Sequence, residues 1–162
     1  MSELSAGDLA PAFQVPAVTR SGETKIALSD YLGKASVVLY FYPKDDTPGC
    51  TTEACNFRDL LPQFEAAGST ILGISPDDQA SHVAFAENHA LPFPLLADAG
   101  HVVADAYGVW KEKTNYGKTY WGIERTTFVI DKAGKIAKIY PRVKVEDHAQ
   151  KALEFVQTLA AN

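Results

Sequence analysis

Two kinds of hydrophobic spacing alternate along this chain. Short continuous runs of β-branched and aromatic residues are typical of buried strands, and they lie at 36–42, 70–74, 93–97, 126–130 and 136–140. Apolar residues three and four positions apart predict helices, which we expect from about residue 50 to 67, from 75–78 to 89, at 102–107 and at 149–159. The order of these segments predicts an α/β fold.

The turns between these segments support the same division. Residues 44–49 combine Asp, Thr, Pro and Gly after a strand, and residues 131–134 connect the last two strands as a hairpin. Gly68 suits the end of the first helix, whereas Pro62 should kink or shorten that helix. We expect one central β-sheet with helices on both faces, folded as a single domain over residues 1–162.

Composition narrows the functional classes. The chain has 20 acidic and 15 basic residues, which gives a net charge of −5. Proteins that bind nucleic acids are usually basic, so we expect no nucleic-acid partner. No apolar run reaches the roughly 18 residues of a membrane span, and the first residues lack the basic and apolar parts of a signal peptide. We therefore expect a cytoplasmic protein without a membrane partner.

The two cysteines, Cys50 and Cys55, lie five residues apart. In a reducing compartment a close pair indicates redox chemistry or metal binding rather than a structural disulfide. Zinc needs about four ligands, and the nearest histidine is His82, so we expect no metal. Two unrelated packed cysteines remain an alternative, because free cysteine packs like a small hydrophobic residue. The four histidines show no catalytic spacing.

Cys50 follows a predicted strand and turn, and it opens a predicted helix. At that place backbone N–H groups lack partners and the helix dipole is positive, so a thiolate is stabilised. The Asp, Thr, Pro and Gly residues around Cys50 argue against a cysteine that is merely packed in the core. The pattern therefore favours Cys50 as a nucleophile.

The residues before Cys50 form a specific motif. Pro43, Thr47 and Cys50 match the Pro-x-x-x-Thr-x-x-Cys signature of the peroxiredoxins, and residues 41–55 resemble the bacterioferritin comigratory protein branch, also called PrxQ. Further similar segments lie at 7–13, 73–75, 93–98, 107–110 and 125–131. This resemblance covers essentially the whole chain. It implies a thioredoxin-like fold, with a central mixed β-sheet flanked by helices, and the reduction of hydrogen peroxide or organic hydroperoxides.

The resemblance also implies roles for individual residues. Cys50 would be the peroxidatic cysteine, which attacks the O–O bond and becomes a sulfenic acid. Thr47 would hydrogen-bond beside the thiolate and the peroxide, and Pro43 would cover the site and exclude water. Arg125 would set its guanidinium against the thiolate and the peroxide oxygens. These roles suit the chemistry, because thiolate attack develops negative charge on oxygen and preorganised donors stabilise that charge.

Each of these residues has a simpler structural interpretation. Thr47 could be only a turn or capping residue, and Pro43 could only end a strand. Arg125 could be a solvated charge at a strand edge. Glu53, three residues after Cys50, could hydrogen-bond within the site or merely be an acidic residue favoured by the helix dipole.

In the same branch a cysteine five residues further on can serve as the resolving thiol, and Cys55 occupies that position. On a regular helix the two Cα atoms would lie roughly 8.6 Å apart. Bridging them without backbone movement requires less than about 7 Å. The helical wheel also turns Cys50 towards the core and Cys55 away from it. The first turn must therefore unwind before Cys55 can condense with the sulfenic acid.

By resemblance, thioredoxin then reduces the disulfide, with a glutaredoxin-type donor as the alternative. We expect a monomer, and no cofactor, because no glycine-rich phosphate-binding motif is present. Two other function classes stay open. A thiol–disulfide oxidoreductase of the thioredoxin type normally has Cys-x-x-Cys spacing, and a non-enzymatic binding module or chaperone would show an exposed apolar patch.

Overall fold

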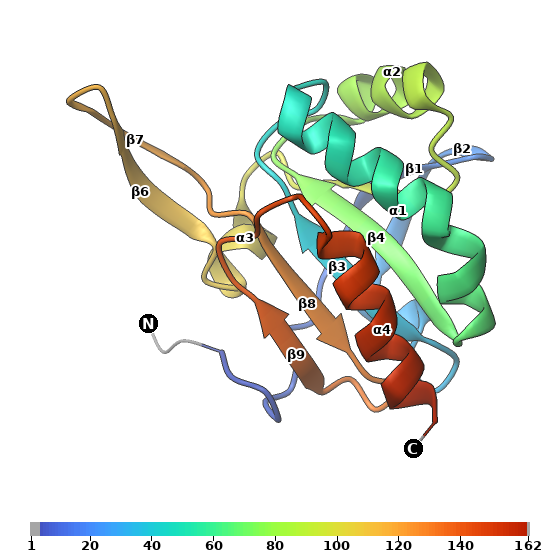
Figure 1. Ribbon diagram of the computed structural model, residues 1–162. Helices are drawn as coiled ribbons and strands as arrows, with labels where there is room; N and C mark the ends of the chain where they lie inside the picture. The colour runs from blue at the N-terminus through green and yellow to red at the C-terminus, as the bar shows by residue number, and fades with distance from the viewer. Residues whose placement is uncertain (1–3, 162) are drawn as a thin grey trace.

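The computed structural model describes residues 4–161, and most of its strands form one seven-stranded mixed sheet (Figure 1). The strand order is β2-β1-β5-β4-β3-β8-β9. These strands are β1 (Gln14–Thr19), β2 (Gly22–Ala27), β3 (Ser36–Phe41), β4 (Ser69–Ser75), β5 (Leu95–Ala97), β8 (Thr126–Ile130) and β9 (Ile136–Tyr140). Two further strands, β6 (Trp110–Asn115) and β7 (Lys118–Ile123), form a separate hairpin. The helices are α1 (Pro48–Ala66), α2 (Gln79–His89), α3 (Val102–Ala106) and α4 (His148–Ala160), with a short 3₁₀ turn at Leu28–Asp30.

The centre of the sheet is built from two parallel crossover units. Strands β3 and β4 are parallel and are connected by α1, and β4 and β5 are parallel and are connected by α2. Strand β8 pairs antiparallel with the other side of β3, and β9 pairs antiparallel with β8. This arrangement confirms the central mixed sheet flanked by helices that the sequence resemblance implies.

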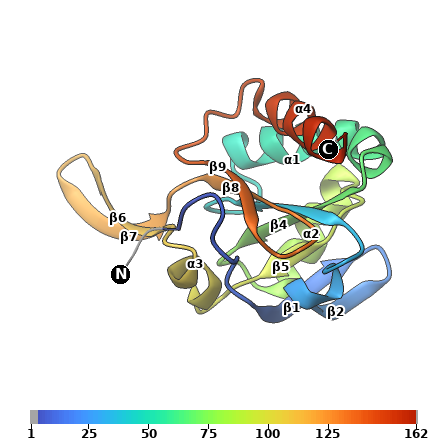
Figure 2. The same cartoon turned by 90° about the horizontal axis from the view of Figure 1, so that it is seen from below.

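The two faces of the sheet are covered unequally. Figure 2 shows α1 and α4 on one side of the sheet and α3 on the other. All six residues of β3 are buried, as expected for a strand with both faces covered. Val38 and Tyr40 pack into the core beneath α1 and α4, whereas Leu39 and Phe41 pack into the core on the α3 side. Strand β3 therefore runs through the middle of the core and ends close to the start of α1.

Helix α1 continues through Pro62 to Ala66, so Pro62 does not shorten it, and a kink at Pro62 stays a prediction. The helix has room for this residue because the proline is exposed and lies in the last turns. Gly68, with φ of 78°, follows the C-cap and ends the helix as predicted. Among the helices of residues 4–161, none combines the length and apolar character needed to cross a membrane.

Two hairpins were not predicted from the sequence. Strands β1 and β2 join the edge of the sheet, and β6 and β7 form an arm that projects from the body of the molecule in Figure 1. The arm turns at Tyr116 and Gly117, whose φ values of 52° and 77° are both positive, as in a type I′ turn. Tyr116 is 96% exposed, and most side chains of the arm face solvent. The arm therefore lacks the buried apolar run by which the central strands were recognised.

Candidate active site

Cys50 lies in the first turn of α1, directly after the loop that leaves β3. Thr47 is the N-cap residue with an extended backbone, and Pro48 begins the helix, a place where proline loses no hydrogen bond. Cys50 is only 1% exposed, as expected for a residue that helical periodicity turns towards the core. The first helical turn directs its side chain into an apolar cluster that includes Tyr40 and Phe57. The thiol is thus held at a helix N-terminus and shielded from bulk water.

Arg125, the residue just before β8, contacts Cys50. Its Nη2 donates a hydrogen bond to Cys50 Sγ at 3.3 Å, as the resemblance implies. The register explains this contact, because Phe41 at the end of β3 pairs with Thr126 at the start of β8. Gly49 leaves room for it, since a Cβ atom at that position would lie 3.3 Å from Arg125 Nη2. The strand pairing therefore brings a fixed positive charge to the thiol.

Glu53 binds the other side of the same guanidinium. Arg125 Nη1 donates to Glu53 Oε1 at 2.6 Å, and the Glu53 side chain is 1% exposed. Burial raises the pKa of Glu53 to about 7, although the adjacent Arg125 acts to lower it. Burial lowers the pKa of Arg125, but Glu53 and Cys50 outweigh burial and raise it overall. Arg125 is therefore a permanent cation held between a thiol and a carboxyl group.

Asp45 holds the loop between β3 and α1 in place through hydrogen bonds of its buried carboxylate. Its carboxylate accepts hydrogen bonds from Tyr42 Oη at 2.6 Å and from Ser81 Oγ at 2.7 Å, and it contacts His82 Nδ1 at 2.7 Å. These partners tie the loop to the end of β3 and to α2. Pro43, half-buried, lies within this fastened segment.

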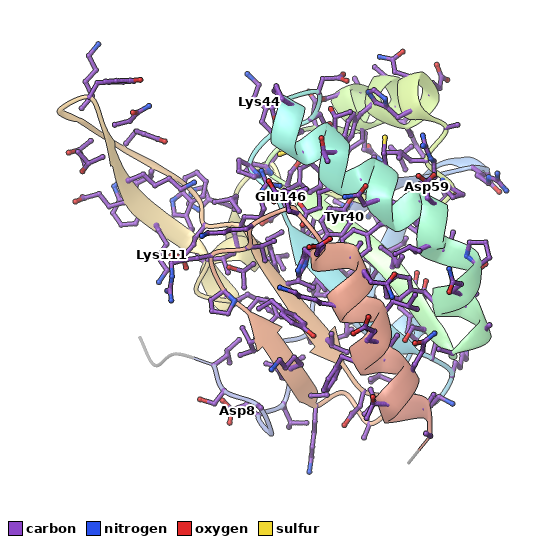
Figure 3. The ribbon with its side chains drawn as sticks, in the orientation of Figure 1. Asp8, Tyr40, Lys44, Asp59, Lys111 and Glu146 are labelled. Atoms are coloured by element: carbon purple, nitrogen blue, oxygen red, sulfur yellow. The ribbon has the colours of Figure 1, made fainter. Side chains whose placement is uncertain are left out.

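Thr47 has a local role in the reduced protein. Its hydroxyl donates to the Lys44 carbonyl at 2.8 Å and makes no side-chain cap bond to the helix. Lys44 lies beside the N-terminal end of α1 in Figure 3. Within residues 4–161, no hydrogen bond joins Thr47 to Cys50. The structure thus shows Thr47 as a turn residue at the N-cap of α1, and a contact with peroxide remains a prediction.

One cluster of potential metal ligands lies next to this loop. Ligand atoms of Asp45, Asp77 and His82 are all within 4.8 Å of one another. However, Asp77 Oδ2 already accepts from Ser75 Oγ at 2.7 Å and from the Asp45 backbone N–H at 2.8 Å. His82 is bonded at both ring nitrogens, to Asp45 and to the Leu96 carbonyl. The cluster therefore serves as a hydrogen-bonded support for the loop.

Cys55 lies on the opposite side of α1 from the buried core stripe. It is half-buried, whereas Cys50 is buried, and both thiols are free. Both residues belong to one continuous helix, as the sequence predicted. A disulfide between them is incompatible with helical backbone geometry, because five residues separate them.

We therefore expect oxidation by one equivalent of peroxide to loosen the start of α1. Only loss of the first helical turns can bring the Cα atoms from roughly 8.6 Å to about 5.5–6 Å. Amide hydrogen exchange over residues 50–58 should be faster in the disulfide form than in the reduced form, while α4 should exchange equally in both. Equal protection of residues 50–58 in the two forms would contradict the unwinding.

The sequence did not reveal His148 and Tyr40 as neighbours of the site. His148 Nε2 lies 4.0 Å from Glu53 Oε2 and 2.8 Å from Thr127 Oγ1. Tyr40 stacks on Phe57 with ring centroids 4.7 Å apart, and Figure 3 shows it in the region between α1 and α4. Both residues are buried in different elements of the fold, so no local spacing signals their proximity to Cys50.

Comparison with known proteins gives the same assignment as the geometry. Residues 6–139 match the model of the AhpC/TSA family. A protein named peroxiredoxin Bcp from Bacillus subtilis is 54% identical over 139 residues, which cover 86% of this chain and 87% of that protein. The chain belongs to the peroxiredoxins, in the Bcp or PrxQ branch.

Solved peroxiredoxin structures share this fold over nearly the whole chain. A cysteine-to-serine mutant of PrxQ from Xylella fastidiosa superposes with a TM-score of 0.90 at 39% identity and covers 99% of both chains. Peroxiredoxin Q from Xanthomonas campestris superposes with a TM-score of 0.85 at 39% identity over 91% of both chains. A further Xanthomonas campestris structure, of bacterioferritin comigratory protein, concerns alkyl peroxide reduction and has a TM-score of 0.85 at 38% identity. The chain is therefore a peroxidase of the peroxiredoxin type.

Proposed function

We propose that this peroxiredoxin reduces hydrogen peroxide and organic hydroperoxides through a sulfenic acid on Cys50. The observation that carries the proposal is the hydrogen bond of 3.3 Å from the Arg125 guanidinium to the Cys50 sulfur at the start of α1. A permanent cation and a helix N-terminus both stabilise a thiolate, which is the nucleophilic form of cysteine. The named relative that reduces alkyl peroxides supports the same substrate class.

The residues around Cys50 supply the other requirements of the reaction. Arg125 stands where it can stabilise the negative charge that develops on the leaving oxygen. Pro43 and Thr47 border the loop above the thiol, where we propose that they exclude water and hydrogen-bond the peroxide. Glu53 holds the guanidinium of Arg125 through Nη1, while Nη2 faces the sulfur.

We further propose that Cys55 resolves the sulfenic acid as an intramolecular disulfide. The Cys55 thiolate displaces the hydroxyl group of Cys50–SOH, which leaves as water after taking up a proton. Thioredoxin, or a glutaredoxin-type donor, then reduces the disulfide by thiol exchange. We propose that the protein carries out this cycle as a single-domain monomer. Its compartment would be the cytoplasm, where reductants of this kind keep thiols reduced. No metal or other cofactor takes part in it.

A coupled assay with thioredoxin, thioredoxin reductase and NADPH tests this cycle. Wild-type protein should consume NADPH when peroxide is added, with no lag. In the Cys55→Ser variant, peroxide should oxidise Cys50 once and the reaction should then stop. The variant lacks the thiol that forms the disulfide, which is the form that thioredoxin reduces. Dithiothreitol is the internal control, since a small thiol can reduce the sulfenic acid directly and should restore turnover. NADPH consumption by Cys55→Ser at the wild-type rate would contradict the resolving role.

A further inference from the structure

The carboxyl group of Glu53 has two oxygens in unlike surroundings. Oε1 accepts the hydrogen bond from Arg125 Nη1 at 2.6 Å. Oε2 is buried and has no hydrogen-bond partner among the described residues. An ionised carboxylate in the interior needs more hydrogen bonds than a neutral carboxyl group, because burial without partners disfavours the charged form. The surroundings of Glu53 therefore suit a group that gains and loses a proton.

Several elements bring titratable groups to Glu53 and to its partners Arg125 and Cys50. Lys113 of β6 is a further cation near Arg125 and Cys50, and burial together with Arg125 lowers its pKa. His148 of α4 lies 4.0 Å from Glu53, and burial, together with Arg125 and Lys151, lowers the pKa of His148 to about 4. Burial raises the pKa of Tyr40 of β3 well above its usual value. Both are neutral at pH 7. Arg125, just before β8, is the charged group in direct contact with Glu53, and the same guanidinium also contacts Cys50 of α1.

We propose that Glu53 holds a proton while Cys50 is a thiolate and releases it when Cys50 is oxidised. The inference rests on the proposed peroxidase function. Arg125 is one cation in contact with two acids, so one anion balances it. Cys50 and Glu53 are three residues apart on α1, where Cβ atoms lie about 5–6 Å apart, and a charge at that range disfavours a second like charge. Oxidation to a neutral sulfenic acid removes the thiolate and leaves Glu53 as the counter-ion of Arg125.

The reaction step then balances without a proton from solution. The Cys50 thiolate bonds to the terminal oxygen of the hydroperoxide, the O–O bond breaks, and two electrons pass from sulfur to the leaving oxygen. The leaving group is an alkoxide, or hydroxide from hydrogen peroxide, and it needs one proton. Glu53 loses one proton in the same step. The number of protons exchanged with the solvent is zero, whatever route the proton takes to the leaving oxygen.

The pKa of Glu53 determines the pH range in which release of its proton on oxidation of Cys50 can be measured. Burial raises this pKa to about 7 in spite of Arg125. A thiolate three residues away acts to raise the pKa of Glu53, and loss of that thiolate on oxidation acts to lower it. The carboxyl group is thus more protonated before oxidation than afterwards, and the difference lies at and above neutral pH. Measurement at pH 8 separates the two states.

Proton counting in a single turnover tests the proposal. A Cys55→Ser background stops the reaction at the sulfenic acid, and one equivalent of hydrogen peroxide is added at pH 8 in weak buffer with a pH-indicator dye. The protein with Glu53 should take up no proton per Cys50 oxidised. With Glu53→Gln added, about one proton should be taken up, because the amide has none to give. Glu65→Gln, at an exposed residue of α1, should match the protein that keeps Glu53.

Trapping with dimedone and mass spectrometry shows whether Cys50 forms a sulfenic acid, independently of the proton count. A protein that yields no trapped sulfenic acid would overturn the peroxidase proposal and this inference with it. Sulfenic acid formed with equal proton counts in the proteins with and without the Glu53→Gln substitution would overturn this inference alone. If Glu53→Gln does not fold, the Cys55→Ser protein decides by itself, because uptake of about one proton at pH 8 contradicts the proposal.

Discussion

Replacing Cys50 with serine is expected to abolish peroxide turnover. A serine hydroxyl at this position is not ionised near neutral pH, so neither the helix N-terminus nor Arg125 can convert it into a nucleophile comparable to a thiolate. The rate of peroxide loss, followed by ferrous–xylenol orange, should fall to the rate without protein. The substitution is nearly isosteric at a site that is 1% exposed, so the protein should still fold.

Cys55→Ser is the matched control for this prediction, because it removes the other thiol from the same helix. It should keep the first, stoichiometric reaction with peroxide and lose only thioredoxin-dependent turnover. Turnover by Cys50→Ser within about tenfold of the wild-type rate would refute the assignment of Cys50 as the nucleophile.

Arg125→Ala is expected to slow peroxide attack by roughly 10–1,000-fold. The side chain contributes a single positive charge that contacts both the sulfur and Glu53, and it is 17% exposed, so solvent screens the charge only in part. Without this cation a thiolate is less stable, and the rise in rate with pH should move to higher pH. Stopped-flow kinetics of a single turnover over a pH series measures both effects.

Two further arginine variants sharpen this test. Arg125→Lys should recover only part of the rate, because an ammonium cannot donate to Glu53 and to the Cys50 sulfur with the geometry of a planar guanidinium. Arg142→Ala removes an exposed arginine and should behave like wild type. A pH–rate profile of Arg125→Ala that coincides with the wild-type profile would make Arg125 a merely solvated charge.

The central layers of the fold follow from local sequence signals. Buried runs such as 36–42 are recognised as strands because both faces of the sheet are covered, and the stripe from Phe57 to Phe64 predicts the buried face of α1. The opposite orientation of Cys50 and Cys55 on α1 also follows from helical periodicity alone. These signals suffice because each depends on residues that are near one another in sequence.

The features of the fold and of the site that the sequence did not predict depend on contacts between segments that are distant in the sequence. The β6–β7 arm is polar and exposed, so no buried period marks its strands. Helical periodicity turns Cys50 towards the core, but the packing of Tyr40 of β3 in the same cluster was not recognised, because Tyr40 belongs to another element. His148 reaches Glu53 only because α4 packs beside α1, and these two helices lie far apart in the sequence. Helix packing of this kind has no signature in a single sequence.

Mass spectrometry of the wild-type protein after one equivalent of hydrogen peroxide tests the central claim most directly. Peptide mapping without reduction should show a single disulfide that joins Cys50 to Cys55, formed within the same chain and reversed by thioredoxin. Oxidation of Cys50 with Cys55 still free, or recovery of both thiols unmodified, would contradict the account.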